Sequence, residues 1–576
     1  MIYLVSSLAW IAAFMLIRKY KEKQNLWRAL IMAAMVYEGY LCLLGGTMTV
    51  LHLPVSIHSI LAVNILCILG MLLYVWKKKT CQTYYIRISD TVFLGVLIVL
   101  IGGLVISRFT PDMKIIFQTI DPSAHLKTAM DFVNTKQVSG MYVSQMLNGL
   151  MIEVLRNVYP DEMVYKVLIV QYGINLFMAA GVFWAVITKY SDRIPMRILG
   201  YVAVLAYILG YPLNDMLYGF VYLQITVTMI CYMIALMQDY MDQEINHWLW
   251  GGMIALGCLA VSVGYTLFAP PIYVSVLICI LYRSKNQGFS GGKTLLHVLE
   301  VFGIPTLLTI WIILIAPKLS ATDVNYGTVL GAEGEAYRNL YSDFLLYSIP
   351  AIYGMVATIK RKKSGLCRFL IPIFGCYYLL FGALMLKDKV STYYFYKLNY
   401  LLWMLVLVMF VVGMSELLQR ERFMFVTILS GILVLTAVYA SGKEQAYHDK
   451  NANYLFYVDS DVLFRIYTCN REFLEHPLQK SDALVQVSGI VDDEHKDERV
   501  IYIGYWENLR WYDALTDQRD EDIIGDDCGQ TLRRFYAGEF GEYAVIEKGS
   551  ENIEEYQQVI EQNVIYENEF AYLIKR

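Results

Sequence analysis

Residues 394–416 read YFYKLNYLLWMLVLVMFVVGMSE, a continuous apolar stretch long enough to cross a lipid bilayer as one helix. Fourteen stretches of this kind occur before Gly442. Over the 576 residues, 57% are hydrophobic and 17% are charged, against about 45–50% and 25% in soluble domains. This composition is typical of a membrane protein. It excludes a soluble enzyme, a disordered scaffold and a nucleic-acid-binding protein.

The candidate spans have the approximate extents 1–17, 29–47, 57–76, 90–107, 164–186, 197–213, 220–237, 247–264, 268–283, 296–316, 343–359, 368–386, 394–416 and 422–441. The first has no basic segment before it and no small-residue cleavage site, and Arg18-Lys19 follow it directly, which predicts a retained helix with its N-terminus outside. We therefore expect an α-helical polytopic membrane protein with about 14 transmembrane helices.

The positive-inside rule gives the orientation of these spans. If the N-terminus is outside, the loops on the cytoplasmic side hold 22 Lys and Arg, about twice as many as the external loops. One cytoplasmic loop, Asp239 to Asn246, is acidic and breaks this pattern. Fourteen crossings return the chain to the outside at Gly442, so the N-terminus and the C-terminal segment are both predicted to be extracytoplasmic in the cell membrane.

Charge divides the chain into two predicted domains. Residues 1–441 form the multi-span domain, with a net charge of +11 and long external loops at about 108–163 and 317–342. Residues 442–576 hold 14 Lys and Arg against 29 Asp and Glu, a net charge of −15. Long loops that connection does not require are usually functional.

Local patterns predict the elements of these external regions. Met146 to Val158 have apolar residues at helical spacing, which predicts an amphipathic helix that lies along the outer membrane surface or packs on the bundle. Its few basic residues favour packing on the bundle. In the tail, strands are expected at 499–504, 543–547 and 570–574 and helices at 506–515 and 552–562, a small α/β domain. Its two cysteines, Cys469 and Cys528, form either one disulfide or two free thiols.

The first external loop contains a candidate for catalysis, Gln118-Thr-Ile-Asp121-Pro-Ser-Ala-His125-Leu-Lys127. Asp followed by Pro is a strong helix-start signal, so Asp121 is expected to begin a helix over 122–134. His125 follows one turn later, and a carboxylate beside an imidazole is a candidate general base. Asp121 as a simple helix cap and His125 as a packed residue are the alternatives.

A second candidate segment is Lys387-Asp-Lys389-Val-Ser-Thr-Tyr393-Tyr-Phe-Tyr396-Lys397, at the outer end of the thirteenth span. Lys397 falls inside the start of an apolar helix, where an ionisable side chain is costly and by default functional. We interpret Lys387, Lys389, Lys397 and Tyr396 as a phosphate-binding group. Snorkelling of Lys397 to the interface is the alternative.

Three further acidic residues are weaker candidates for binding an acceptor or substrate. Asp215 lies in a short external turn after the sixth span, and Glu333 and Asp343 lie around the second long loop. Ordinary solvated turns also need such residues.

With its acidic residue in a large external loop, its surface helix, its many spans and its small C-terminal α/β domain, the sequence resembles the GT-C superfamily of integral membrane glycosyltransferases. In that superfamily the donor is a polyprenyl-phosphate-linked sugar, and the loop acid is a base or metal-associated acid. Here that acid corresponds to Asp121 in Asp-Pro-Ser-Ala-His, where many members carry Asp-x-Asp or Glu-x-Asp. The loop follows the fourth span instead of the first, which implies three additional N-terminal spans.

The resemblance implies inverting transfer of a sugar to an extracytoplasmic acceptor, such as a cell-surface glycan, a wall polymer or a lipid. Asp121 would deprotonate the acceptor, and the lysines would stabilise the leaving phosphate. A divalent metal ion, magnesium or manganese, is left open by the single acid. The expected partners are the lipid bilayer, the lipid-linked donor and the acceptor.

Two other functions stay open from the sequence. Fourteen spans also suit a flippase or exporter of lipid-linked oligosaccharides, although no internal repeat is visible and Glu38 is the clearest charged residue in mid-span. A non-catalytic envelope assembly protein that binds through its tail is the third interpretation.

Overall fold

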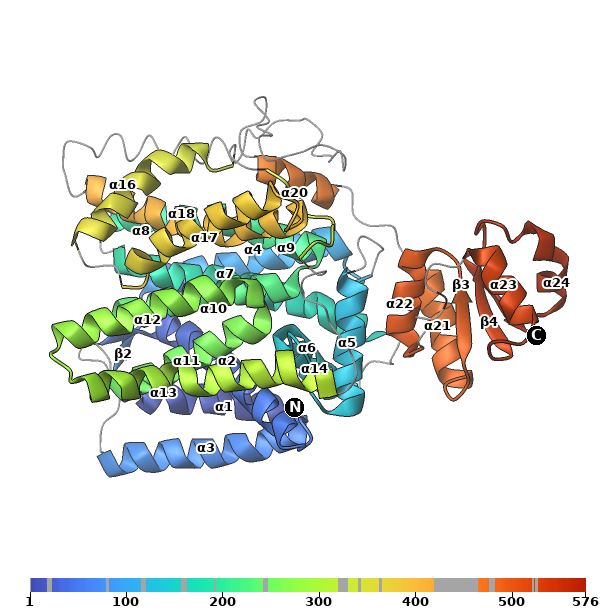
Figure 1. Cartoon of the computed structure of the whole chain (residues 1–576), viewed down its shortest axis with the longest axis horizontal. Coiled ribbons are helices and arrows are strands. Elements are labelled where there is room, and N and C mark those ends of the chain that lie inside the picture. Colours follow the sequence, from blue (N-terminus) through green and yellow to red (C-terminus); the bar gives the residue numbers. More distant parts are fainter. Residues whose placement is uncertain are drawn as a thin grey trace.

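A bundle of apolar helices and a small α/β domain beside it make up the described part of the chain (Figure 1). The structure is a computed structural model. It describes residues 2–17, 23–78, 82–114, 121–156, 163–190, 193–241, 247–319, 330–339, 343–361, 365–418, 465–475, 482–518, 520, 523 and 527–576.

The long bundle helices coincide with the predicted spans. They are α1 (Ile2–Ile17), α2 (Leu26–Val50), α3 (Ile57–Lys78), α4 (Ile88–Phe109), α7 (Tyr165–Ile187), α8 (Ile194–Leu209), α10 (Val221–Met241), α11 (His247–Gly264), α12 (Ala269–Asn286), α13 (Gly291–Thr309), α16 (Leu345–Arg361), α17 (Cys367–Met385) and α18 (Thr392–Leu418). The fourteenth predicted span, 422–441, lies outside the described residues. Within the described ranges, ten helices are long and apolar enough to cross a membrane. The chain is a helical polytopic membrane protein.

Shorter elements connect these helices. They are β1 (Gln24–Asn25), β2 (Tyr84–Tyr85), α5 (Asp121–Thr135), α6 (Val143–Leu155), η2 (Thr188–Tyr190), α9 (Tyr211–Tyr218), η3 (Thr266–Phe268), the π-helical turn η4 (Ile310–Ile315), α14 (Ala316–Leu319) and α20 (Arg465–Glu475). The predicted helix over 122–134 is confirmed as α5. The helix predicted from Met146 onward is α6, and Met146 and Leu150 are buried as it packs on α5 and α7.

Helix α20 belongs to the bundle, although it follows the predicted domain start at residue 442, which lies outside the described residues. It packs against α9 and α4. The Tyr467 hydroxyl donates to the Ala206 carbonyl at 2.8 Å, and the Asn470 amide donates to the Leu209 carbonyl at 2.8 Å. The first described part of the tail therefore completes the helical bundle instead of the α/β domain.

The α/β domain is built on a four-stranded sheet with the order β3-β4-β6-β5, in which β3 and β4 are parallel and the other pairs antiparallel. Its elements are α21 (Asp482–Glu494), β3 (Val500–Ile503), α22 (Trp506–Thr516), α23 (Cys528–Tyr536), β4 (Tyr543–Glu547), η8 (Glu554–Tyr556), α24 (Gln557–Gln562), β5 (Val564–Glu567) and β6 (Ala571–Lys575). All four residues of β3 are buried, as expected of a strand covered on both faces.

The three predicted strands and the helix predicted at 506–515 are confirmed, whereas α21, α23 and β5 were not predicted. The helix predicted at 552–562 is confirmed only in part, because the 3-10 turn η8 precedes the short helix α24. Cys469 and Cys528 are both free thiols. Cys469 lies in α20 of the bundle and Cys528 begins α23 of the α/β domain. The disulfide alternative is therefore absent from the structure.

The acidic loop that broke the charge pattern begins with a buried ion cluster. Asp239, at the end of α10, accepts two hydrogen bonds from the Arg28 guanidinium at 3.0 and 2.8 Å, and Lys189 approaches it to 2.8 Å. Arg28 and Lys189 were both counted in predicted cytoplasmic loops. The charge of Asp239 is therefore neutralised by basic residues assigned to the same side.

Candidate functional site

A close approach between two helices places the start of α5 against the bundle. Helix α9 ends at Gly219, which has the left-handed φ of +78°. A Cβ atom at this position would lie 2.5 Å from Cγ of Pro122. Glycine is required here both for the backbone conformation and for the contact. This contact brings Asp121 and Pro122 next to the first residues of α10.

Lys397 is the buried cation of the site. Its side chain projects from the second turn of α18 and is 1% exposed. The ammonium donates a hydrogen bond to the Tyr222 hydroxyl at 2.7 Å and another to the Tyr393 hydroxyl. It also lies 4.1 Å from the centre of the Phe220 ring and 3.9 Å from that of Tyr393, within cation–π range.

We call Phe220, Tyr222, Tyr265, Tyr393 and Lys397 the lysine cage, because the four rings surround the ammonium. Within the described residues, Lys397 forms no ion pair. The carboxylates of Asp121 and Asp215 are the acidic groups that act on it electrostatically. Because no carboxylate is bonded to it in the described chain, the ammonium can pair with an incoming anion.

Asp121 and His125 lie on the side of α5 that faces this cage. The His125 ring centre is 4.9 Å from that of Tyr222. Burial lowers the pKa of His125, the Asp121 carboxylate opposes this effect, and the Lys397 charge adds to it, so that the pKa is about 4. His125 is therefore neutral at physiological pH, and its ring nitrogen can exchange hydrogen bonds with a hydroxyl group.

Several buried polar atoms around Asp121 have no hydrogen-bond partner in the described parts of the chain. They are Nε2 of His125, Oδ1 of Asp215 and the hydroxyls of Tyr172 and Tyr265. Asp121 acts electrostatically on both tyrosines as well as on His125. Most buried polar groups in folded proteins are hydrogen-bonded, so a group of orphaned atoms indicates a place where a polar ligand binds.

Asn214, the residue before Asp215 in α9, has hydrogen-bond partners for its side chain. The Asn214 amide donates to Asn470 Oδ1 at 3.0 Å and accepts from the Tyr400 hydroxyl at 2.6 Å. These bonds tie α9 to α18 and α20. Asp215 is 2% exposed on a helix fixed in this way. Its unsatisfied oxygen therefore lies on a rigid support.

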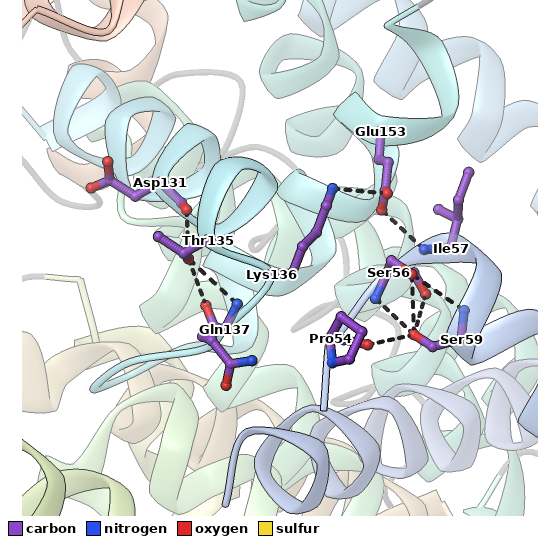
Figure 2. Close-up of polar contacts among 9 residues, drawn as sticks. All are labelled: Pro54, Ser56, Ile57, Ser59, Asp131, Thr135, Lys136, Gln137 and Glu153. Atoms are coloured by element: carbon purple, nitrogen blue, oxygen red, sulfur yellow. Dashed lines mark hydrogen bonds and ion pairs between the residues drawn. The ribbon is translucent and has the colours of Figure 1, made fainter. Parts of the chain in front are cut away.

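The far end of α5 is anchored to two other helices, as Figure 2 shows. The Lys136 ammonium and the backbone N–H of Ile57 both donate to the Glu153 carboxylate, each at 2.9 Å. The backbone carbonyl of Lys136 also accepts from the N–H of Val55 at 2.8 Å. These contacts join α5, α6 and α3, so α5 is held by the bundle at both ends.

Arg108 is a second buried cation, in the last turn of α4. Its guanidinium donates to the Phe473 carbonyl at 2.8 Å. Its Nε and Nη2 atoms have no partner among the residues that the structure describes. The next residue, Phe109, stacks on Tyr172 with ring centres 5.9 Å apart. The orphaned donors can bind an anion or a carbonyl group.

The remaining predicted phosphate-binding residues lie apart from the lysine cage. Lys387 and Lys389 are exposed on the turn between α17 and α18, and neither side chain has a hydrogen bond or ion pair with any described residue. Tyr396 is buried beside Phe395 and makes no contact with Lys397 of the kinds described above. Of this predicted group, the structure brings only Lys397 together with Asp121.

Glu333 and Asp343 contribute to helix ends. The Glu333 carboxylate accepts from the backbone N–H of Thr392 at 3.1 Å, at the start of α18, and from Arg338 at 3.1 Å. Asp343 accepts from the N–H of Ile466 at 3.0 Å, at the start of α20, and from the Tyr211 hydroxyl at 3.4 Å. These bonds give both residues a structural role.

The residues present do not fit a divalent cation. Within the described residues there is no group of three or more His, Cys, Asp and Glu side chains placed to hold a metal ion. Around Asp121 the donors are separate carboxylates and one imidazole, and the charged Lys397 lies among them.

Of the four aromatic residues of the cage, only Tyr393 belongs to the segment singled out in the sequence, and the other three were not predicted. Phe220 and Tyr222 lie at the start of α10, and Tyr265 lies between α11 and η3, far from Lys397 in sequence. The high tyrosine content, 46 residues, was the only signal in the sequence. Arg108 was not predicted either, because an arginine at the end of an apolar span can reach the membrane interface and needs no function there.

The chain is similar in structure to the apo form of the oligosaccharyltransferase of Archaeoglobus fulgidus. The two share 9% sequence identity with a TM-score of 0.34, over 79% of this chain and 69% of that chain. No model of a protein family matches the sequence. No curated protein matches it either.

Proposed function

We propose that the protein is a membrane glycosyltransferase that moves a sugar from a polyprenyl-phosphate-linked donor to an acceptor hydroxyl. The observation that carries this proposal is that Asp121 acts electrostatically on the buried ammonium of Lys397, which has no ion-pair partner in the described chain. A base and a cation in one site are what transfer from a phosphate leaving group requires.

The acceptor side of the reaction is assigned to α5. The acceptor oxygen loses its proton to the Asp121 carboxylate and forms a bond to the anomeric carbon of the sugar. Neutral His125, with its orphaned Nε2, orients the acceptor hydroxyl by hydrogen bonding. Attack from the face opposite the leaving group inverts the configuration at that carbon.

The donor side is assigned to the lysine cage. The bond between the anomeric carbon and the phosphate oxygen breaks, and the electron pair stays with the lipid phosphate. Lys397 stabilises the added negative charge, and the hydroxyls of Tyr222 and Tyr393 keep its ammonium oriented. Such preorganised charge is effective because it needs no rearrangement during the reaction.

The proposed location of this chemistry is the extracytoplasmic side of the cell membrane. The counts of basic residues in the loops support this side, and Arg28, Lys189 and Asp239 then lie on the cytoplasmic side. The acceptor is a glycan, wall polymer or lipid of the cell envelope.

Turnover by purified Asp121→Asn protein in nanodiscs tests the proposal. Asparagine is as good as aspartate at a helix start, so α5 should be preserved, whereas loss of the base lowers turnover of a polyprenyl-phosphate sugar about 100- to 10,000-fold. Asp131→Asn is the matched control, with the same change ten residues further along α5. It should retain turnover.

Two outcomes would overturn the proposal. Undiminished turnover by Asp121→Asn would remove Asp121 as the base. Absence of transfer by the wild-type protein with every lipid-linked donor, together with donor movement across the bilayer of proteoliposomes, would favour a flippase.

A further inference from the structure

Helix α5 lies between the bundle and the α/β domain, and its two long faces carry different residues. Asp121 and His125, four residues apart, share one face. Lys127 and Asn134, seven residues apart, share another, about 200° around the helix from His125 at 3.6 residues per turn. The face away from the candidate site is thus polar and available to a second partner.

The α/β domain is that partner. Helix α22 packs against α5, and Figure 1 shows the two side by side. One carboxylate reaches both polar residues of α5. Asp517 accepts from the Lys127 ammonium at 2.9 Å through Oδ1 and from the Asn134 amide at 2.8 Å through Oδ2. It spans two turns of the helix.

Lys127 also binds the backbone of the α/β domain. Its ammonium donates to the carbonyls of Asp513 at 3.3 Å and Gln518 at 3.0 Å. The Gln518 side chain in turn accepts from the N–H of Val500 at 3.2 Å, at the start of β3. A continuous set of hydrogen bonds therefore connects α5 to the buried strand of the sheet.

Backbone conformation orients the Asp517 carboxylate. Asp517 follows the last residue of α22 and has φ +56°, the left-handed conformation that ends many helices. Glycine adopts this conformation without strain, so Asp517→Gly removes both side-chain bonds and leaves the turn intact.

We propose that the α/β domain positions the catalytic helix, with Asp517 and Lys127 as the positioning residues that hold Asp121 against the lysine cage. This inference rests on the proposed function for the role of Asp121. The contacts of α5 do not depend on that function. Its two ends contact the bundle, and its outer face contacts the α/β domain. Through this contact, binding of a ligand to the α/β domain can change the position of Asp121 in the candidate site.

The test compares Asp517→Gly and Lys127→Met with wild type by amide hydrogen exchange and by kinetics in nanodiscs. We expect amides of α5 to exchange about two- to tenfold faster, while those of β3 and β4 are unchanged. Turnover should fall about 10- to 100-fold, with a much smaller change in the KM for donor, because Lys397 on α18 is untouched.

Three controls separate positioning from general damage. Lys127→Arg keeps the charge and the donors and should recover turnover. Lys127→Met combined with Asp517→Gly should lose less than the sum of the two single losses, because both changes break the bond between Lys127 and Asp517, while the Asn134 bond is lost only with Asp517. Glu567→Gln, which removes the exposed ion pair with Lys548 in the same domain, should match wild type.

The two proposals fail in different ways. If wild type transfers sugar and both variants keep its turnover or its α5 exchange rate, the positioning proposal is overturned. If wild type transfers nothing, the glycosyltransferase proposal fails, whereas faster α5 exchange in both variants would still support control of this helix by the α/β domain.

Discussion

Helix α10 carries a buried charged cluster at each end, and the two clusters differ in how their polar atoms are satisfied. At its last turn, Asp239 is 0% exposed and is bonded by Arg28 and Lys189. At its first turn, Tyr222 contacts the buried ammonium of Lys397. Both clusters join helices distant in sequence, so both required the folded chain to form.

The Asp239 cluster is a complete ion network. Arg28 uses two guanidinium nitrogens on the two oxygens of Asp239, and its Nε donates to the Ala185 carbonyl at 3.0 Å. Such bidentate hydrogen bonding offsets the free energy that is lost when the two charges are removed from water. The purpose of this cluster is structural.

The cluster at the other end is incomplete. Lys397 is bonded by hydroxyls, while Oδ1 of Asp215 and Nε2 of His125 have no partner in the described chain. Incomplete satisfaction costs stability, and proteins retain it where a ligand completes the network. Unsatisfied polar atoms, more than buried charge, therefore distinguish this candidate site from the structural ion cluster.

Breaking the complete cluster should have the largest effect on stability. Arg28→Met leaves Asp239 buried with one partner fewer and should lower the free energy of unfolding by about 3–5 kcal/mol. Denaturant unfolding in detergent micelles measures this loss, with the exposed Lys285→Met as control. A stable Arg28→Met protein that has lost turnover would contradict the structural assignment.

A pH titration sharpens the comparison at the incomplete cluster. Because burial lowers the pKa of His125 to about 4 from an ordinary 6.5, the fold favours its neutral form. The free energy of unfolding is therefore highest, as far as His125 is concerned, above about pH 6.5. It falls as the pH drops toward 4, by at most about 3 kcal/mol, because the unfolded chain binds a proton that the folded chain does not. Between pH 7 and 4, the free energy of unfolding should change less with pH for His125→Asn than for wild type. An identical pH profile in that variant would show that His125 does not titrate in this way.

Removing the unpaired cation should affect binding instead of folding. Lys397→Met should weaken polyprenyl phosphate binding in nanodiscs about 10- to 100-fold, while the free energy of unfolding stays constant or rises by about 1 kcal/mol. The exposed Lys387→Met should bind within about twofold of wild type. If Lys397→Met loses as much stability as Arg28→Met, the lysine cage is a structural cluster like that of Asp239, and the proposed difference between the two clusters is wrong.

Local sequence patterns were sufficient for the elements. Continuous apolar stretches predicted the helices, because crossing a bilayer imposes a length and a composition on each segment separately. The Asp121-Pro122 pair predicted the start of α5, and the short runs at 499–504, 543–547 and 570–574 predicted β3, β4 and β6. Each of these signals lies within about twenty neighbouring residues.

Only the tertiary structure decided which of these elements meet. Lys387, Lys389 and Lys397 are close in sequence, yet only Lys397 turns into the bundle, where residues from α10 and the turn after α11 surround it. Asp343 and Glu333 accept backbone hydrogen bonds at the starts of α20 and α18, contacts that the sequence did not predict.

The tail shows the same division. Its strands could be predicted from the sequence. The packing of α20 on the bundle and the hydrogen bonds of Asp517 with α5 could not. Residues 127 and 517 are brought together by the way two independently patterned helices pack. The sequence by itself determined the membrane class, the spans and the start of α5. The site depended on long-range packing, because periodicity defines a face within one helix and carries no information about the face it meets.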